Sequence, residues 1–381
     1  MQLNKQQLQG LPTPAYVYDT ALLAATLDAI KAAVRDDANY HVHYAIKAND
    51  HPAILKQIAA AGLGADCVSG GEISAAIEAG FPAQKIGFAG VGKADWEIEL
   101  AIKVGIGFFN VESREELEVI SQIATALQTE ARVCLRINPD VSANTHAHIT
   151  TGREEDKFGI ARQHMVEVIR LAQQLPYLSF VGLHFHIGSQ LLDMTDYEAL
   201  CARVNELQDL LEAEGITVPN INVGGGLGID YAEPDLHPIA DFQNYIDTFR
   251  SHLRLRDGQQ LHFEPGRAVV AQMGILLTRV LFVKHTETKD FVILDAGMTD
   301  LIRPALYGAL HKIENISAEG SEVKTYDIVG PICESSDIFA RDYQLPITKR
   351  GDLIAIRSAG AYGQTMASTY NHRSLPKTFL V

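Results

Sequence analysis

Two side chains in this sequence stand where an apolar run ends, and together they could carry out chemistry. Lys47 ends the run HVHYAIK (41–47), and Glu264 ends the run LHFE (261–264). Alternation of apolar and other residues before each charged group is typical of strands. A lysine amine can form a Schiff base with an aldehyde, and a carboxylate can hold a ring nitrogen protonated. An amine and a carboxylate on one rim are what pyridoxal phosphate requires, because its protonated ring accepts electrons.

Eight short apolar runs, most of them followed by a helical pattern, predict the scaffold for these two groups. Stretches 73–79, 113–127 and 199–214 have helical periodicity, and Ser113 with Glu116 predicts a capping box. Strand alternating with helix eight times predicts an α/β fold of the (β/α)8 TIM-barrel type. The runs are HVHYAIKA (41–48), GADCVSG (64–70), KIGFAG (85–90), IGFFNVES (106–113), ARVCLRINP (131–139), LSFVGLHFHIGS (178–189), INVGGG (221–226) and LHFEPG (261–266).

Polar and glycine residues gather at the carboxyl end of each run. Barrel enzymes build their active sites at that rim, from the loops that follow the strands. We therefore expect the chemistry to lie there. The residues at these ends are Lys47, Asp66, Ser69, Gly90, Gly92, Asn110, Glu112, Arg136, Asn138, His186, Ser189, Gly224, Gly225, Gly226, Glu264 and Arg267.

The glycine triplet at 224–226 predicts a phosphate site. Its backbone amides can approach an anion closely, although a glycine triplet also fits a tight turn. Ser189, Gly266 and Arg267 would supply further donors near the late strands, where such barrels bind phosphate.

Three further side chains have both a functional and a structural interpretation. His186 could stack on the cofactor ring, or it could be a core histidine with satisfied hydrogen bonds. His184, two residues earlier, fits the core equally well, and its role stays open. Asp66 could orient Lys47.

The pattern of residue types changes at residue 268. The runs ILLTRVLFVKH, DFVILDAG, TYDIVGP and DLIAIRSAG are rich in β-branched residues and separated by turns. They predict a mostly β second domain, antiparallel and barrel-like. The run PAYVYD near the N-terminus predicts a strand that joins it. The expected domains are residues 1–20 as that strand, 21–267 as the barrel and 268–381 as the β domain.

Composition excludes several classes of function. Among 381 residues there are 32 Lys and Arg against 47 Asp and Glu, a net charge of −15 without a basic cluster, so nucleic acid is not an expected partner. The first ten residues lack the apolar core of a signal peptide, and no stretch predicts a membrane span. Four cysteines without a CxxC pair predict a reduced, cytoplasmic protein. Cys67, Cys134 and Cys201 are interpreted as buried core residues, and no metal site is expected.

The motifs as a set resemble those of the diaminopimelate decarboxylases, which belong to the fold type III group of pyridoxal phosphate enzymes. The resemblance runs nearly end to end, without a departure at a position that carries chemistry. The matching motifs are YAIKAN (44–49), DCVSGGE (66–72), FAGVGK (88–93), FNVES (109–113), RINPD (136–140), KFGI (157–160), GLHFHIGSQ (182–190), NVGGGLG (222–228), EPGR (264–267), DAGMTDLIRPALYG (295–308), GPICESSD (330–337) and GAYG (360–363).

This resemblance implies a role for each matching residue. Lys47 would form the imine with pyridoxal 5′-phosphate, Glu264 would pair with the pyridine nitrogen, and His186 would stack on the ring. Tyr362 would join Ser189, the glycine triplet, Gly266 and Arg267 around the phosphate. The resemblance also implies a homodimer with shared active sites, in which Cys333 and Glu334 come from the partner chain and Cys333 donates the proton.

The expected substrate is meso-diaminopimelate, which would be converted to L-lysine and CO2 in the last step of lysine biosynthesis. Its distal end carries a carboxylate as well as an ammonium group, and the fork of arginine donors suits a carboxylate. The resemblance assigns the distal end to Arg303 and Tyr307, with Arg267 nearby and Glu334 for the ammonium group. Arg303 could instead form a surface or interface ion pair.

Three alternatives remain at this stage. A decarboxylase of ornithine, arginine or carboxynorspermidine shares the scaffold, but Arg303 would bring it no advantage. An amino-acid racemase of the same fold usually limits ring protonation with an arginine, whereas Glu264 favours it. A catalytically silent regulator that binds partners would be expected to lose Lys47 or Cys333, and both are present.

Overall fold

The computed structural model describes residues 5–141 and 157–381 and divides the chain into two compact units. One unit comprises residues 27–228 and 241–266, and the other comprises residues 1–26, 229–240 and 267–381. Residues 229–240 thus interrupt the first unit in sequence and belong to the second. The domain boundaries expected at 20 and 267 stay predictions. The loop at 144–156, whose conformation the sequence leaves open, lies outside the described residues.

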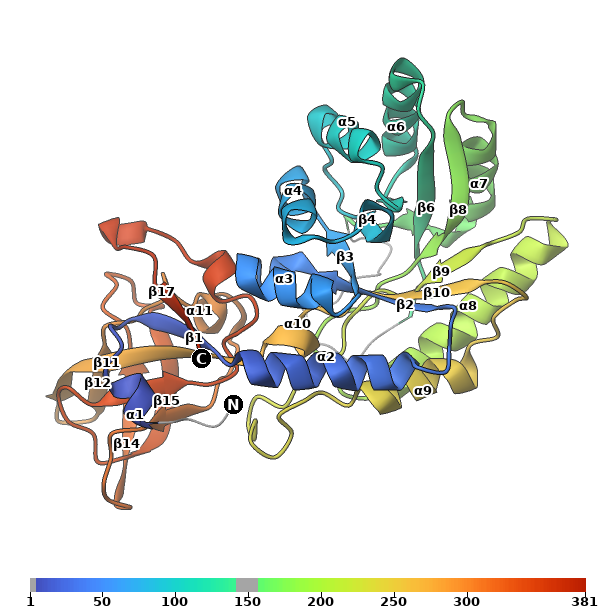
Figure 1. Cartoon of the computed structure of the whole chain (residues 1–381). Coiled ribbons are helices and arrows are strands. Elements are labelled where there is room, and N and C mark those ends of the chain that lie inside the picture. The colour runs from blue at the N-terminus through green and yellow to red at the C-terminus, as the bar shows by residue number, and fades with distance from the viewer. Residues whose placement is uncertain (1–4, 142–156) are drawn as a thin grey trace. The chain divides into compact units, whose positions relative to one another are not determined.

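The first unit is a closed barrel of eight parallel strands, as the apolar runs predict (Figure 1). Neighbours in the barrel follow the order β5-β4-β3-β2-β10-β9-β8-β6, and pairing of β5 with β6 closes it. A short strand β7 (Ile160–Ala161) adds to β6. The barrel strands are β2 (Tyr40–Ala45), β3 (Gly64–Cys67), β4 (Ile86–Phe88), β5 (Phe108–Val111), β6 (Ala131–Asn138), β8 (Leu178–His184), β9 (Asn220–Asn222) and β10 (Gln260–Phe263).

Helices separate these strands along the chain. They are α2 (Thr20–Val34), α3 (Pro52–Ala60), α4 (Gly70–Ala79), α5 (Asp95–Val104), α6 (Arg114–Leu127), α7 (Met165–Gln174), α8 (Thr195–Ala213) and α9 (Phe242–His252), with short 3₁₀ helices η1 (Ile46–Ala48), η2 (Ala83–Lys85) and η3 (Arg162–His164). Helices α8 and α9 pack together (Figure 1), and the rings of Tyr197, Tyr245 and Phe249 meet edge-on between them. Such aromatic contacts stabilise beyond the area they bury.

The capping box at α6 is present only in part. Ser113 caps the helix, because its hydroxyl accepts a hydrogen bond from the Glu116 amide at 3.1 Å. The Glu116 carboxylate, however, bonds the amide of Glu112 at 2.7 Å and the buried amine of Lys93 at 2.6 Å. Tertiary pairing with a lysine therefore replaces the local contact that the sequence predicts.

The second unit is a largely antiparallel β-sheet. The order β13-β16-β11-β12-β14-β15 forms its main path, and β1 pairs with both β11 and β17. The strand predicted near the N-terminus thus joins this sheet. Its strands are β1 (Ala15–Tyr18), β11 (Gly274–His285), β12 (Asp290–Leu294), β13 (Ile313–Asn315), β14 (Val323–Val329), β15 (Ile338–Pro346), β16 (Leu353–Ile356) and β17 (Lys377–Leu380).

This sheet has its own apolar core, in which Leu8, Val17, Ile275, Leu277 and Leu353 are buried together. Its helices are short: α1 (Lys5–Gln9), α10 (Arg267–Val270), α11 (Arg303–Tyr307), η4 (Gln364–Met366) and η5 (Tyr370–His372). Across residues 5–141 and 157–381, every helix is too short or too polar to span a bilayer.

Candidate active site

Glu264 lies directly after β10 and receives hydrogen bonds from three buried side chains. Asn222 donates to Oε1 at 2.6 Å, and Asn110 donates to the same oxygen at 3.1 Å. Nε2 of His184 lies 3.0 Å from Oε2. His184 ends β8, Asn222 ends β9 and Asn110 lies in β5, so three strands converge on one carboxylate.

These donors keep the Glu264 carboxylate charged although it is buried. Burial alone raises the pKa of Glu264, but His184 and the Asn222 hydrogen bond outweigh that effect and hold the pKa well below its ordinary value. Within the described residues, no lysine or arginine forms an ion pair with Glu264. The barrel therefore holds an anion whose charge can act on a bound group.

Lys47 is close to Asp66, but it does not belong to the strand that the sequence predicts for it. Strand β2 ends at Ala45, and Lys47 sits in the single 3₁₀ turn η1. Nζ of Lys47 lies 4.0 Å from Oδ2 of Asp66, and 46% of the lysine side chain is exposed. Burial, followed by repulsion from Glu264, raises the pKa of Asp66 well above its ordinary value, while Lys47 opposes that shift.

Lys47 and Glu264 follow neighbouring parallel strands and lie at the same end of the barrel. Strand β2 pairs with β10 in parallel, and the amide of Ala45 donates to the carbonyl of Pro265 at 3.2 Å. The amine and the carboxylate are thus delivered to one rim, as their positions after the strands predict.

The glycine triplet turns sharply after β9. Gly224 and Gly226 have φ values of +70° and +106°, a conformation that favours glycine. A Cβ at Gly225 would lie 2.1 Å from the Glu264 carbonyl oxygen, so glycine there lets two chain segments touch. Close packing explains this glycine without a ligand. Gly224 and Gly225 are buried, and their amides already donate to Oδ1 of Asn222 at 2.9 Å and to Nδ1 of His186 at 3.4 Å.

His186 lies beyond β8, which ends at His184, rather than on the same strand face. Its Nδ1 accepts a hydrogen bond from the Gly225 amide at 3.4 Å. Burial, Arg136 and Lys47 lower the pKa of His186 well below its ordinary value, so the ring is neutral. Ser189 follows in the same connection, and Gly266 lies between β10 and α10.

The second unit brings two buried arginines to one phenol. Arg267 donates to Oη of Tyr231 at 2.7 Å, and Arg303 donates to the same oxygen at 2.9 Å. Both guanidinium groups also lie over the Tyr231 ring, and Arg267 lies over Tyr362 at 5.0 Å as well. Arg267 and Arg303 are only 7% and 6% exposed.

Arg303 has neutral partners. Besides Tyr231 it donates to Nε2 of His311 at 3.0 Å, while Nδ1 of His311 donates to the Arg357 carbonyl at 2.8 Å. Burial and Arg303 lower the pKa of His311 to about 3, so that ring is uncharged. Burial also lowers the pKa of Arg303, and Arg267 repels it. The described hydrogen-bond partners of Arg303 are Tyr231 and His311 and include no carboxylate, so this buried cation suits an anionic ligand.

The other predicted residues of this unit are more exposed. Tyr307 ends α11 and is 42% exposed. Cys333 and Glu334 are exposed in the connection between β14 and β15. The Cys333 amide donates to Asn371, and Glu334 accepts from the Tyr370 hydroxyl at 2.6 Å. The described contacts of Cys333 and Glu334 thus do not include the arginines or Tyr307.

Comparison with known proteins decides the family. Residues 22–271 match the family described as "Pyridoxal-dependent decarboxylase, pyridoxal binding domain". The chain belongs to the pyridoxal-dependent decarboxylases. A diaminopimelate decarboxylase of Bacteroides thetaiotaomicron is 60% identical over 98% of this chain and 96% of its own length. One of Vibrio cholerae is 44% identical over 95% and 85%. The crystal structure of diaminopimelate decarboxylase from Helicobacter pylori complexed with L-lysine superposes with a TM-score of 0.92 at 41% identity, and covers 99% of this chain and 94% of that one.

The residues of this decarboxylase fit its cofactor, pyridoxal 5′-phosphate. A buried carboxylate that stays ionised without a lysine or arginine partner in the described chain suits a protonated ring nitrogen. Lys47 offers a partly exposed amine on the same rim, and the neutral His186 ring lies beside the glycine turn. The fit therefore rests on the charge and placement of these groups.

Several residues around Glu264 in the barrel unit, and around the two arginines in the other unit, receive no role from the sequence. Asn110 stands among the rim residues but without a role, and Asn222 precedes the glycine triplet without a charge or motif to mark it. Tyr231 lies in the segment that the sequence assigns to the barrel. His311 lies three residues after the end of LIRPALYG. Only the folded chain shows that these side chains hold Glu264 and the two arginines.

Proposed function

We propose that this protein is a pyridoxal phosphate-dependent decarboxylase of meso-diaminopimelate, which it converts to L-lysine and CO2. The observation that carries the choice of substrate is Arg303, a buried guanidinium whose described partners, Tyr231 and His311, are both neutral. Relatives at 40–60% identity are named diaminopimelate decarboxylases, which agrees with this substrate.

Arg303 would bind the distal carboxylate of the substrate. A buried cation without a carboxylate costs desolvation free energy, and a bidentate pair with the substrate would offset that cost. Arg267 shares the Tyr231 oxygen and would add to the positive field. Tyr307 and Glu334 would complete the distal end, with Glu334 bound to the ammonium group. Ornithine lacks the distal carboxylate and would leave Arg303 unpaired.

Lys47, Glu264 and His186 would hold the cofactor at the barrel rim. When bound, pyridoxal phosphate accepts the electron pair that the departing carboxylate leaves on the substrate. Glu264 would keep the ring nitrogen protonated, because its own low pKa keeps it negative. His186 would pack on the ring as a neutral side chain. Ser189, the glycine triplet, Gly266, Arg267 and Tyr362 would bind the phosphate.

Cys333 would complete the reaction with a proton. After CO2 leaves, the Sγ–H of Cys333 would protonate the substrate carbon, and solvent would restore the thiol. We assign this role to Cys333 and Glu334 of the partner chain in a homodimer with shared sites, in the cytoplasm. Mixing Lys47→Ala with Cys333→Ala chains tests the shared site, because each mixed dimer would regain one complete site of its two. Random mixing makes about half of the dimers mixed, so the whole mixture should recover about a quarter of the wild-type activity.

The substrate is tested by CO2 release from meso-diaminopimelate, L-ornithine, L-arginine and L-lysine, each with saturating cofactor. We expect release from diaminopimelate alone, with lysine as the product by mass spectrometry. Faster release from ornithine or arginine would refute the proposal. Loss of the α-proton without CO2 would instead indicate a racemase.

A further inference from the structure

A cavity lies at the end of the barrel opposite Lys47 and Glu264. Its volume is about 350 Å³, enough for a small molecule. The residues that line it begin or precede the barrel strands: Tyr40 and His41 in β2, Gly64 in β3, Arg132 in β6 and Gln260 in β10. Because all strands run in parallel, these starts form the amino-terminal mouth. Lys47 and Glu264 follow the carboxyl ends of β2 and β10 and so lie at the other mouth.

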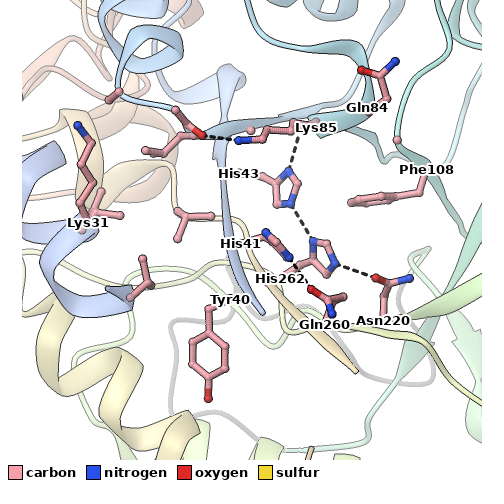
Figure 2. A pocket seen from close by; sticks show the side chains of 18 of the residues that line it. Lys31, Tyr40, His41, His43, Gln84, Lys85, Phe108, Asn220, Gln260 and His262 are labelled. Atoms are coloured by element: carbon pink, nitrogen blue, oxygen red, sulfur yellow. Dashed lines mark hydrogen bonds between the residues drawn. The ribbon is translucent and has the colours of Figure 1, made fainter. Parts of the chain in front are cut away.

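Histidines replace the aliphatic side chains that usually fill this part of a barrel. His43 and His262 are buried, and His41 borders them (Figure 2). Gly64 makes room for His43, because a Cβ there would lie 2.3 Å from His43 Nδ1. The chain therefore gives up aliphatic packing at this mouth and retains a polar group that the proposed reaction does not use.

His43 and His262 form a chain of three hydrogen bonds (Figure 2). Nδ1 of His43 lies 3.0 Å from the Lys85 carbonyl, and Nε2 of His43 lies 2.9 Å from Nδ1 of His262. Nε2 of His262 lies 3.1 Å from Oδ1 of Asn220. This series of hydrogen bonds ends at two oxygens, the Lys85 carbonyl oxygen and Oδ1 of Asn220, and each of them can only accept.

The orientation of the Asn220 amide is fixed by a second contact. Its Nδ2 donates to the Val181 carbonyl, so Oδ1 must face His262. Three hydrogen bonds between two acceptors need three N–H protons, but two neutral imidazoles carry only two. The third proton makes the pair a cation. Without it, one of the three contacts lacks a proton, and two lone pairs face each other there at 2.9 to 3.1 Å.

The surroundings make that third proton costly while the cavity is empty. Burial lowers the pKa of His43 to about 4 and that of His262 to about 2. His41, Lys85 and Arg132 also disfavour a further positive charge.

Lys31 on α2 lines the same cavity, and the described lining holds no aspartate or glutamate. Glu264, which follows the end of β10 and lies two residues beyond His262, is the acid that favours protonation. Tyr40 stays neutral, because burial raises its pKa to about 12, and burial likewise raises the pKa of the Cys134 thiol in β6.

We propose that this mouth binds a small oxyanion, and that the His43–His262 pair takes up its third proton when the anion binds. Lys31, Lys85 and Arg132 supply permanent positive charge around the opening. The protonated His43–His262 pair supplies one further positive charge, which is buried. The anion compensates the charge that the proton brings, and the proton completes the hydrogen-bond chain. By linkage, affinity for the anion rises as pH falls.

The test uses the holoenzyme, in which the cofactor already occupies the phosphate site, and inorganic sulfate, which does not titrate near neutral pH. Calorimetric titration at pH 6.5 in two buffers of different ionisation enthalpy measures proton uptake. We expect uptake of up to one proton per chain and tighter binding at pH 6 than at pH 8. Succinate serves as the second probe and tells whether carboxylates are accepted as well as inorganic anions.

Three variants make the test specific. Arg132→Ala, at an exposed position, should weaken sulfate binding by about fivefold. Lys56→Ala removes an exposed charge from α3 outside the cavity and should leave binding unchanged. His262→Gln, checked for folding by circular dichroism, should abolish proton uptake. Absence of millimolar sulfate binding, binding without proton uptake, or equal effects of Arg132→Ala and Lys56→Ala would each overturn the proposal.

Discussion

Nε2 of His184 lies 3.0 Å from Oε2 of Glu264, and both side chains are buried. Nδ1 of His184 is buried too and finds no hydrogen-bond partner among the described residues. Nε2 of His184 contacts one oxygen of Glu264 while Asn222 and Asn110 donate to the other, and the carboxylate, whose pKa lies well below its ordinary value, keeps its negative charge.

That charge predicts the effect of Glu264→Gln. The amide keeps the size of the side chain but loses the charge that would hold the ring nitrogen protonated. We expect kcat for CO2 release to fall on the order of 10²–10³-fold, a typical cost of removing one electrostatic contact. Glu130→Gln, at an exposed position, is the matched control and should retain full activity. A Glu264→Gln enzyme with normal kcat would exclude the proposed role of this carboxylate.

The two arginines predict a selective loss of the distal contact. Arg303→Ala should lower kcat/KM for diaminopimelate on the order of 10²-fold, since a charge-assisted contact contributes about 3 kcal/mol. Activity toward ornithine, if measurable, should not fall. Arg350→Ala, an exposed arginine of the same unit, is the control. An equal loss with both substrates would show that Arg303 supports the fold rather than the distal carboxylate.

Tyr231 links Arg303 to Arg267, so Tyr231→Phe tests their shared partner. The phenylalanine keeps the ring under both guanidinium groups and removes only the hydroxyl. We expect a higher KM for diaminopimelate, by about fivefold for the loss of one hydrogen bond per arginine. An unchanged KM in the steady-state assay would show that the hydroxyl does not position the arginines.

Cys333 should be the thiol that reacts in the folded protein. Cys67, Cys134 and Cys201 are buried, and burial raises the pKa of each of these three thiols, whereas Cys333 is exposed. Treatment with iodoacetamide should add one label, at Cys333 by peptide mass spectrometry, and should abolish CO2 release. Cys333→Ser should be inactive and unlabelled. Full activity after complete labelling of Cys333 would remove it as the proton donor.

The sequence predicts most of the scaffold, because each barrel strand is a short apolar run that ends in a turn. Lys47 and Glu264 follow from the same pattern, since parallel strands deliver their carboxyl ends to one rim. Contacts between distant residues do not follow from it. Asn110 reaches Glu264 across 154 positions, and Glu116 pairs with Lys93 rather than closing its own capping box. A local sequence pattern does not show whether a side chain will pair with a residue nearby in the sequence or with one that only the fold brings close.

His311 predicts a pH dependence of stability. In the folded chain its Nε2 accepts from Arg303 and its Nδ1 donates to a carbonyl, so the ring stays neutral down to a pKa of about 3. In the unfolded chain the ordinary pKa is about 6.5. Below pH 6.5 the unfolded state therefore binds a proton that the folded state does not. Stability falls as pH drops from 6.5 toward 3, with a slope of about 1.4 kcal/mol per pH unit from this residue.

Urea unfolding of wild type and His311→Gln between pH 7 and pH 4.5 measures this contribution. Glutamine can accept a hydrogen bond from Arg303 but does not titrate. The unfolding free energy of the variant should therefore fall less steeply with pH, by a slope that corresponds to about one proton. His164→Gln, an exposed histidine, should follow the wild-type slope. If wild type and His311→Gln lose stability in parallel as the pH falls, His311 is protonated in the folded protein. Arg303 would then lie beside a cation. The proposal that Arg303 binds the distal carboxylate, which depends on His311 being a neutral partner, would then fail.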